Sequence, residues 1–460
     1  MRGWIEEELR TIDLGDKRLD NRLKRIVHLL SKNPTASIPQ ATKTRADTKA
    51  TYRFFDCSGV NPDDIRDAHY QSTVERCKGH DVILVVQDST GFDFTNRCIE
   101  DIGVLNNEYQ RGLMMHSGLA VSTNGIPLGL LHQNVWSRRM EEGGRAEKKE
   151  KRHKKRIEEK ESYRWIETME NARNRLPVET NIVIIGDREA DIYELFTESQ
   201  KRSVHILIRA EYNRRVESEE KYLLDTIKNS PVRGRMKIRI EHARERKARE
   251  ADLSIRYVKI MLCPPRRNTK RDILPPISVN AILLNEENPP PHVKAVNWLL
   301  ITTLPVNCLE DAIRCAEWYK YRWLIERYHY VLKSGCKIEE LQLETKERLE
   351  RALATYCIVA WRELWLTYEA RKNPDTPADK ILEKDEIEAL YCTIHETKKP
   401  PEKVPTVREA VRWIAQLGGF LGRKSDGEPG VKTIWRGLME LAVIVRTWRL
   451  LRGGEDVGNG

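Results

Sequence analysis

The sequence is poor in cysteine, and its cysteines form no recognisable pattern. Nine of them are scattered over 460 residues, with no CxxC pair and no Cys/His cluster at the spacing of a zinc site. The pattern therefore argues against a thiolate zinc site and predicts reduced thiols, as in a cytosolic protein. No run of about 18 apolar residues occurs, and residues 1–20 contain no signal core. We therefore expect a cytoplasmic protein with no membrane partner.

Positive charge is in modest excess and is concentrated near the start of the chain. The 80 Lys and Arg residues outnumber the 70 Asp and Glu residues, a pattern that suits a polyanion partner but also occurs in proteins that bind none. Between Lys17 and Arg53 there are ten basic residues and two acidic ones. Apolar spacing predicts one helix that ends before Asn33 and a second from about Arg45. The basic side chains expected to contact DNA phosphates are Arg22, Lys24, Arg25, Lys43, Lys49 and Arg53. A solvated basic face explains the same pattern equally well.

Two β-branched runs, each followed by an aspartate, predict the centre of a sheet. Val82–Val86 precedes Asp88, and Asn181–Gly186 precedes Asp187. Such runs are typical of strands buried on both faces, and ligands of open α/β sheets bind at the carboxyl ends of their strands. We expect the two carboxylates to lie together, where their mutual repulsion favours a bound cation.

Two further strands and a later group of strands complete the prediction for the sheet. Residues 116–123 and 127–136 flank an Asn-Gly turn signal and predict a meander with the first strand. Alternating patterns between about 202 and 305 predict a β-rich insertion of about 100 residues. Residues 138–160 carry both charges and predict a solvated loop and helix.

A single helix from Trp318 to Lys333 is predicted to carry the remaining polar side chains of the site. At roughly 100° per residue, Tyr319, Arg322, Glu326 and Lys333 share one face. A salt-bridged stripe on a solvated helix explains the same spacing. An acid flanked by cations also suits a site that binds a metal ion and a phosphodiester together.

The order of these elements is that of a ribonuclease-H-like sheet. On such a scaffold Asp88, Asp187 and Glu326 can hold two divalent cations for an in-line displacement at phosphorus. Hard oxygen ligands favour two Mg²⁺ ions, with Mn²⁺ as a substitute. Tyr319, Arg322 and Lys333 would then bind the DNA backbone beside the scissile bond.

The sequence resembles the bacterial insertion-sequence transposases of the DDE class that carry a Tyr-x2-Arg-x3-Glu-x6-Lys signature, the group that includes the transposase of transposon five. Tyr319, Arg322, Glu326 and Lys333 fit that signature without an insertion. Further matches run along the whole chain, at residues 14–18, 52–54, 129–133, 187–192, 297–300 and 417–420. One departure is Tyr330, where the family example has a basic residue.

The resemblance implies an α/β fold in three parts. These are a helical N-terminal domain (1–68) that binds transposon ends, a ribonuclease-H-like catalytic core (69–370) interrupted by the β-rich insertion, and a helical C-terminal dimerisation domain (371–460). It implies cut-and-paste transposition, in which a homodimer binds terminal inverted repeats, cleaves them through a hairpin and joins the 3′ ends to target DNA.

The resemblance also implies roles for three more residues and a setting. Trp298 and Trp323 match tryptophans that hold a flipped base, and Arg209 matches a residue near the transposon end. A double-stranded DNA partner and a bacterial, nucleoid-associated location follow from the same resemblance. Two other functions stay open: a ribonuclease-H-like nuclease that only hydrolyses DNA, and a transposase-derived repressor or architectural protein that no longer cuts.

Overall fold

The computed structural model describes residues 3–105, 107–139, 155–240, 249–265, 274–423 and 426–452. The β-strands are β1 (Val82–Asp93), β2 (Gly112–Ser122), β3 (Pro127–Trp136), β4 (Asn181–Gly186), β5 (His205–Arg209), β6 (Gly234–Ile240), β7 (Arg249–Leu262), β8 (Ile277–Asn285) and β9 (Asn297–Thr302). The α-helices are α1 (Trp4–Glu8), α2 (Lys17–Ser31), α3 (Ile38–Thr42), α4 (Arg45–Asp56), α5 (Pro62–Cys77), α7 (Arg164–Arg175), α8 (Tyr193–Lys201), α9 (Leu223–Asn229), α10 (Leu309–Lys320), α11 (Trp323–Tyr330), α12 (Lys346–Lys372), α13 (Lys384–Ile394), α14 (Val407–Leu417) and α15 (Val431–Arg452). Shorter 3₁₀ turns are η1 (Ile157–Glu159), η2 (Glu161–Tyr163), η3 (Arg188–Ala190), η5 (Ile338–Glu340) and η6 (Ala378–Lys380), and η4 (Val331–Gly335) is a π-helical turn.

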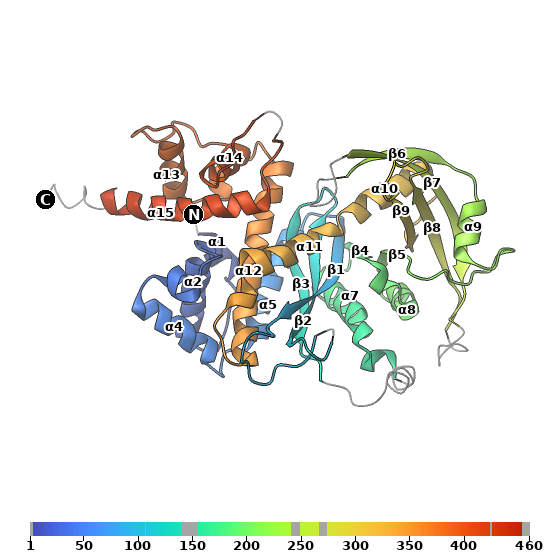
Figure 1. Cartoon of the computed structure of the whole chain (residues 1–460), viewed down its shortest axis with the longest axis horizontal. Helices are drawn as coiled ribbons and strands as arrows, with labels where there is room; N and C mark the ends of the chain where they lie inside the picture. The colour runs from blue at the N-terminus through green and yellow to red at the C-terminus, as the bar shows by residue number, and fades with distance from the viewer. Residues whose placement is uncertain are drawn as a thin grey trace.

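All nine strands belong to one sheet, in the order β3-β2-β1-β4-β5-β9-β8-β7-β6 (Figure 1). β1, β4 and β5 are parallel to one another, and every other neighbouring pair is antiparallel. The strands predicted between residues 202 and 305 therefore extend the central sheet directly. β8 fills the place between β7 and β9.

Alternate residues of the central strands enter two separate hydrophobic cores. Leu84 and Val86 of β1 face the core formed with α10, α11, α12 and the N-terminal helices. Ile83 and Val85 face the core formed with α7, α8 and α9. Burial on both faces explains why these strands are almost continuously β-branched or leucine-rich. The sheet is thus the middle of three layers, with α7 and α8 on one side and α11 and α12 on the other (Figure 1).

β1 is longer than its apolar run predicts, so the prediction that it ends at Asp88 was wrong. The parallel pairing with β4 stops at Val86, but the antiparallel pairing with β2 continues from Asp88 to Asp93. β2 is longer than β4 and supplies hydrogen-bond partners to the last residues of β1, which the β1 sequence alone does not reveal. Asp88 therefore lies within the strand, just past the end of its parallel neighbour.

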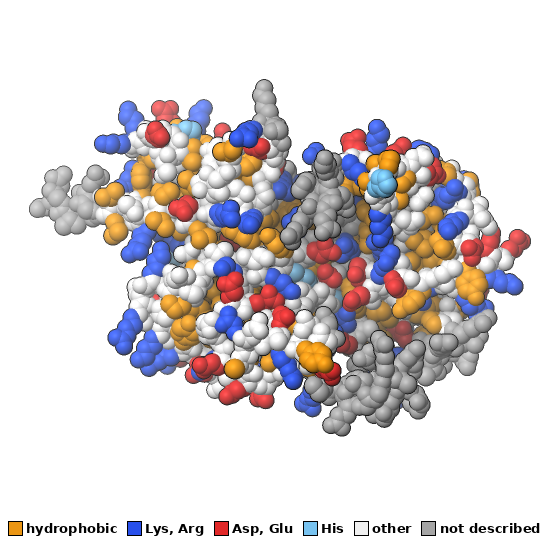
Figure 2. Space-filling view, viewed as in Figure 1, with side chains coloured by type: hydrophobic (Ala, Val, Ile, Leu, Met, Phe, Trp, Pro, Cys, Tyr) orange, Lys and Arg blue, Asp and Glu red, His pale blue; other side chains and the backbone are white. Residues whose placement is uncertain are grey.

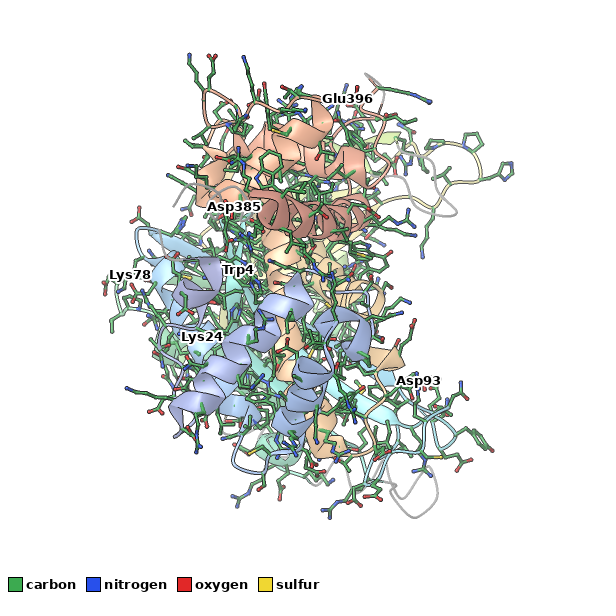
Figure 3. The ribbon with its side chains drawn as sticks, turned by 90° about the vertical axis from the view of Figure 1, so that its left-hand side faces the viewer. Trp4, Lys24, Lys78, Asp93, Asp385 and Glu396 are labelled. Carbon is green, nitrogen blue, oxygen red and sulfur yellow. The ribbon has the colours of Figure 1, made fainter. Side chains whose placement is uncertain are left out.

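The N-terminal helices pack against the long helix α12 and share its hydrophobic core. Both helices predicted in this region are present, as α2 and α4, and α2 begins at an N-cap where Asp16 accepts a hydrogen bond from the Arg18 N–H. In Figure 3, Lys24 of α2 lies below Trp4 of α1 and Asp385 of α13, and its Nζ pairs with Glu6 at 2.6 Å.

A buried polar cluster connects α1 to α5 beneath the N-terminal helices. The Glu8 carboxylate accepts hydrogen bonds from His69 Nδ1 at 2.5 Å and from Arg76 Nη1 at 2.6 Å, and only 3% of its surface is exposed. Burial alone would raise the pKa of Glu8, but Arg76 and His69 lower it to about 2. Glu8 is therefore a buried, fully paired carboxylate.

A third hydrophobic core lies between the end of α12 and the helices α13, α14 and α15. The helices α13, α14 and α15 agree with the prediction that residues 371–460 are helical. Among the described residues, no helix is long and apolar enough to cross a membrane. Most of the charged segment predicted as a loop, residues 140–154, lies outside the described residues.

Candidate functional site

Asp88 and Asp187 lie beside each other at the edge of the parallel strands. The register pairs Val86 with Ile185, so Asp88 and Asp187, each two residues further on, occupy adjacent positions of β1 and the loop after β4. Asp187 Oδ1 accepts a hydrogen bond from the Glu189 N–H at 2.9 Å. The predicted proximity of the two carboxylates is thus present in the structure, even though β1 continues beyond it.

The charge of Asp88 is poorly compensated. Burial raises the pKa of Asp88, and the negative charge of Asp187 raises it further, to about 7. His329 Nδ1 lies 3.9 Å from Asp88 Oδ2, but burial lowers the pKa of His329 to about 3, so this imidazole is neutral and offsets no charge. A cation bound between the two aspartates would relieve this repulsion.

Asp88→Asn is expected to stabilise the metal-free protein by about 1–3 kcal/mol at pH 8. The pKa of Asp88 is about 7 in the folded protein, above the ordinary value of 3.8. Between these values the unfolded protein has released this proton and the folded protein still holds it, so the free energy of unfolding falls as the pH rises. Urea unfolding in EDTA at pH 8 and pH 5 measures the gain, which should be smaller at pH 5. Asp93→Asn, on the same strand, is the control, because hydrogen bonds from Thr95 lower the pKa of Asp93. An equal gain for Asp88→Asn at both pH values would contradict this explanation.

The prediction of one continuous helix from Trp318 to Lys333 was wrong. α10 ends at Lys320, α11 begins at Trp323, and the segment around Lys333 is the π-helical turn η4. Hydrogen bonds from the Leu324 N–H to the Tyr321 carbonyl and from the Ile325 N–H to the Arg322 carbonyl tighten the junction. The angle per residue therefore departs from 100° at both ends of α11, although Arg322 still interacts with both Tyr319 and Glu326.

Glu326 faces the aspartates from α11 but is paired with a cation. Arg322 Nη1 lies 2.7 Å from Glu326 Oε1, one helical turn away, and 51% of the Glu326 side chain is exposed. Burial alone would lower the pKa of Arg322, yet Glu326 and Tyr319 raise it above its ordinary value. The charges of both Arg322 and Glu326 also influence Asp88, which places all three in one electrostatic group.

Tyr319, Arg209 and Trp298 line one side of this group. Burial raises the pKa of Tyr319, whose ring meets Trp298 edge to face at 5.4 Å between centroids. Arg209, the last residue of β5, donates a hydrogen bond to the Asn297 carbonyl at 2.8 Å and interacts electrostatically with Tyr319 and Asp187. The structure therefore brings these three predicted residues to the site.

Lys333 and Trp323 lie further from the carboxylates. Lys333 Nζ is 3.8 Å from Glu339 Oε1 and 5.7 Å from the centre of the Phe92 ring. Trp323 packs edge to face against Tyr368, with the Arg327 guanidinium 5.0 Å from its ring centre. Lys333 is thus held by an acid that the sequence analysis did not identify.

Tyr330 faces the C-terminal helices. Its ring stacks on Trp435 of α15, with 6.1 Å between centroids. The tyrosine that stands where the family example has a basic residue thus contributes to the packing between α11 and α15.

Comparison with protein families agrees with this geometry. The chain matches three family models: Transposase DNA-binding over residues 1–60, Transposase DDE domain over 159–362 and Transposase Tn5 dimerisation domain over 358–458. The chain belongs to the Tn5-like DDE transposases. Among solved structures it is similar to a piggyBac transposase synaptic complex with hairpin DNA, at 11% identity and a TM-score of 0.38, over 96% of this chain and 78% of the other.

The family matches give the transposase three attributes. It is a DNA transposase with an enzymatic DDE domain, it binds DNA, and it carries a domain for dimer formation. The DDE match includes Asp187 and Glu326 but begins after Asp88, so the assignment of Asp88 rests on the geometry described above.

The donor set of the transposase suits the divalent metal that a DDE domain implies. Three carboxylates from β1, the end of β4 and α11 offer hard oxygen ligands, and the raised pKa of Asp88 reflects uncompensated negative charge. Within the described ranges, however, no three acidic, histidine or cysteine side chains converge closely enough to hold a metal ion. Glu326 is paired with Arg322 through Oε1, at 2.7 Å.

The six predicted basic residues of the N-terminal helices divide into two groups. Lys24 pairs with Glu6 at 2.6 Å, and Arg25 and Arg22 pair with Asp47 at 3.1 and 3.7 Å. Of these six residues, the exposed ones that form no ion pair with a described residue are Lys43, Lys49 and Arg53. Figure 2 shows Lys and Arg side chains protruding at the outer edge of α2 and α4, so this surface offers free cations to a polyanion.

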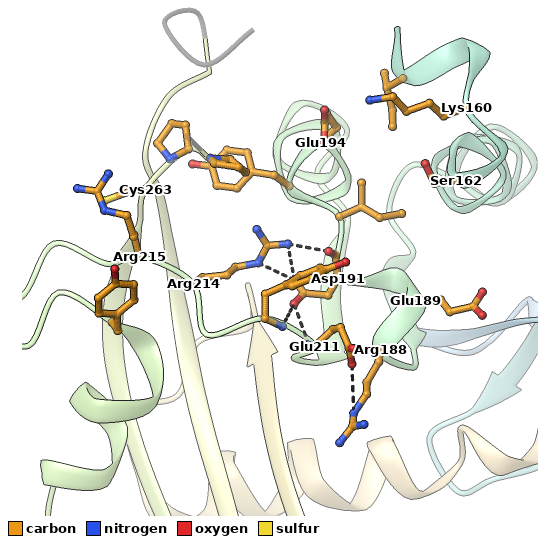
Figure 4. Close-up of a pocket in the computed structure, with 17 residues that line it drawn as sticks. Lys160, Ser162, Arg188, Glu189, Asp191, Glu194, Glu211, Arg214, Arg215 and Cys263 are labelled. Atoms are coloured by element: carbon orange, nitrogen blue, oxygen red, sulfur yellow. Dashed lines mark hydrogen bonds and ion pairs between the residues drawn. The ribbon is translucent and has the colours of Figure 1, made fainter. Parts of the chain in front are cut away.

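A pocket of about 810 Å³ adjoins the loop that follows Asp187 (Figure 4). Asp191 forms its floor and accepts hydrogen bonds from the Tyr212 N–H and from Arg214 Nε. Arg188, at the rim, lies 3.6 Å from Glu211. These pairs anchor the loop after β5 against the loop after β4, next to the candidate carboxylates.

The structure also shows two residues that the sequence analysis missed. Arg164 of α7 and His116 of β2 both bond to Ser89, which follows Asp88. Neither residue stands in a motif or beside an acidic residue of the site in the sequence, so only their place in the fold reveals them.

Proposed function

We propose that the transposase binds terminal inverted repeats, cleaves transposon ends by two-metal phosphoryl transfer and joins the 3′ ends to target DNA. The observation that carries this proposal is the pair of adjacent aspartates at the sheet edge, faced by Glu326 and Arg322 of the α11 region. The domain limits (1–68, 69–370 and 371–460) are part of the proposal. So is a ribonuclease-H-like core, supported by the order β3-β2-β1-β4-β5 with β2 antiparallel, and the strands β6–β9 would be its insertion.

Asp88, Asp187 and Glu326 would hold the ions of the reaction. When bound, two Mg²⁺ ions would supply the positive charge that activates a water or a 3′-hydroxyl and stabilises the leaving oxygen. The protein contributes a rigid pair of carboxylates and one mobile carboxylate, Glu326. Arg322, released from Glu326, would present its paired N–H donors to a phosphate group of the DNA.

Further side chains would position the DNA. Lys333 would supply a point charge to the backbone, and Tyr319 and Arg209 would contact the strand near the transposon end. A hairpin intermediate would place a flipped base against Trp298 or Trp323, since a flat ring can replace lost base stacking. The half-buried position of Trp298 against Tyr319 supports this arrangement.

The C-terminal helices would form the homodimer of the end complex. Val443, Leu450 and Leu451 of α15 are exposed by 52%, 70% and 71%. Apolar side chains at the outer end of a helix are suited to a contact with a second subunit. This end of α15 projects away from the rest of the molecule in Figure 1.

The alternative function is a non-cleaving DNA-binding repressor or architectural protein derived from a transposase. The closed Arg322–Glu326 ion pair, which leaves the three carboxylates unassembled, is the observation that favours it. The deciding experiment uses DNA that carries the inverted repeats flanking the gene, incubated with the protein in Mg²⁺ or in EDTA. Metal-dependent hairpins or double-strand ends support the transposase function, whereas specific binding without cleavage supports the repressor.

Lys49→Ala combined with Arg53→Ala is expected to weaken end binding and to reduce its salt dependence. The two residues lie one turn apart on the exposed face of α4, and each lost phosphate contact should reduce the slope of log K against log[salt] by about 0.9. Fluorescence anisotropy in EDTA at several salt concentrations measures the slope. Lys384→Ala, an exposed lysine on α13, should leave it unchanged. An unaltered slope in the α4 variant would exclude both residues from the DNA interface.

A further inference from the structure

Arg164, the first residue of α7, connects Ser89 of β1 with Glu189 of the loop after β4. Its Nε donates a hydrogen bond to Ser89 Oγ at 2.9 Å, and its Nη2 lies 2.7 Å from Glu189 Oε2. Its Nη1 donates to the Glu161 carbonyl at 2.9 Å, which fixes the guanidinium to the start of its own helix. Every nitrogen of the guanidinium is therefore engaged, and only 12% of the side chain is exposed.

The two side-chain partners of Arg164 belong to the residues that hold the candidate carboxylates. Ser89 directly follows Asp88 in β1, and the Glu189 N–H donates a hydrogen bond to Asp187 Oδ1 at 2.9 Å. Arg164 thus binds the side chain of the residue next to Asp88 and the side chain of the residue whose N–H orients Asp187. One guanidinium connects both carboxylate-bearing segments.

The contact to Ser89 is fixed on its other side by His116 of β2. Ser89 Oγ lies 2.8 Å from His116 Nδ1, which accepts the Ser89 proton when His116 Nε2 donates to the amide oxygen of Gln87. His116 Nε2 then donates to Gln87 Oε1 at 3.1 Å, so the neutral imidazole carries its proton on Nε2. Burial lowers the pKa of His116 well below its usual range, as this arrangement requires.

Gln87 and Ser89 occupy the face of β1 opposite to Asp88, since side chains alternate along a strand. The bonds to His116 and Arg164 therefore hold the strand from behind without occupying the space in front of the carboxylate. The side chains that support β1 therefore lie on the other face of the strand from Asp88.

We propose that Arg164 is a positioning residue that sets the separation of Asp88 and Asp187 and thereby the affinity of the site for divalent ions. This inference rests on the proposed two-metal function. Arginine suits the role because its rigid planar fork presents donors in fixed directions to separate partners, whereas lysine carries its donors on one compact ammonium. Loss of a residue that orients a metal ligand typically weakens metal affinity about 10–100-fold.

The test compares Arg164→Lys with the parent and with Arg175→Lys. Arg175 lies on the same helix and pairs with Asp67 at 2.7 Å, far along the chain from the carboxylate segments, so its substitution controls for general damage to α7. Full-length protein is bound to pre-cleaved end DNA, in which no bond remains to be cut, and titrated with Mn²⁺. The electron paramagnetic resonance signal of free Mn²⁺ reports bound ions without any turnover.

We expect Arg164→Lys to bind DNA ends normally in EDTA and to need about 10–100-fold more Mn²⁺ for half-saturation, while Arg175→Lys matches the parent. Glu189→Ala provides a second variant that does not depend on the folding of a buried site, because 62% of the Glu189 side chain is exposed. It keeps the N–H that bonds to Asp187 and should shift the Mn²⁺ titration in the same direction. Parent-like Mn²⁺ affinity in both variants would overturn the proposed role of Arg164 and leave the two-metal function standing. Absence of Mn²⁺ binding by the parent would overturn both.

Discussion

Asp187→Ala is expected to abolish cleavage of transposon ends while leaving their binding intact. Asp187 lies at the end of β4 beside Asp88, and its carboxylate is oriented by the Glu189 N–H. Removing one ligand of a two-ion site costs several kcal/mol of transition-state stabilisation, which corresponds to a loss of at least about a thousandfold in rate. Single-turnover cleavage of end DNA in Mg²⁺ measures this loss.

Glu326→Gln should reproduce the effect by a different route. The amide keeps the size of the side chain and can still accept a hydrogen bond from Arg322, but it removes the negative charge that a metal site needs. Gel-shift binding in EDTA should match that of the parent in both variants. Glu310→Gln, an exposed glutamate in the first turn of α10, serves as the control and should cleave normally. Cleavage by Glu326→Gln at the parental rate would remove Glu326 from the reaction and favour a different third ligand.

Glu8→Ala is expected to lower the free energy of unfolding by about 3–5 kcal/mol, because it leaves a partly buried Arg76 without its partner. Glu8 accepts from Arg76 and His69 at once, and the substitution also creates a cavity under α1. The His69 imidazole, which accepts a hydrogen bond from the Leu130 N–H at Nε2, would lose the acceptor for its Nδ1 proton. Urea unfolding at pH 7 measures the change.

Glu75→Ala is the matched control for Glu8→Ala. Glu75 also pairs with two cations, Lys78 and Arg10, but it does so at the surface, where ion pairs contribute about 0–1 kcal/mol. The stabilisation by Glu8 should also disappear on acidification, because its pKa is depressed to about 2 and its contribution is lost between about pH 4.5 and pH 2. Equal destabilisation by both substitutions at pH 7 would show that burial of the Glu8 cluster adds nothing.

The two predictions concern different properties: Asp187→Ala is expected to affect cleavage, and Glu8→Ala is expected to affect the stability of the fold. Glu8 joins α1, within the region matched by the DNA-binding family model, to α5 and through it to the catalytic sheet. Its loss should therefore weaken the attachment of the end-binding helices to the core. For Asp187 and Glu326, in contrast, we expect substitution to remove cleavage and to leave the fold intact, because both side chains are at least partly exposed.

Elements with a strong local pattern were predicted closely from the sequence. β4 has the predicted limits, Asn181–Gly186, and β3 agrees at both ends because the Asn-Gly signal places the turn before it. α2 and α4 combine apolar spacing with N-caps at Asp16 and Thr44. In these segments local propensity and burial favour the same conformation.

Elements whose form depends on their neighbours were predicted poorly. β1 continues past Asp88 because β2 supplies partners, and the helix around Tyr319 is interrupted where α10 packs near β5 and α11 near β1. A charge pattern read at 100° per residue assumes an undisturbed helix. The junction at Tyr321 carries no proline or glycine, whereas the π-helical turn ends in Ser334-Gly335, a local signal that the pattern did not take into account.

The sequence by itself was enough to predict the type of site and the family. The spacing of Tyr319, Arg322, Glu326 and Lys333 and the aspartates after two apolar runs are local patterns of residue type. The tertiary structure alone decided which partner each charge meets. It pairs Glu326 with Arg322, gives Asp88 a raised pKa beside Asp187, and places Arg164 between Ser89 and Glu189. Such pairings join residues that are up to about a hundred positions apart, and the strength of an electrostatic contact depends on distance and burial, which only the folded chain defines.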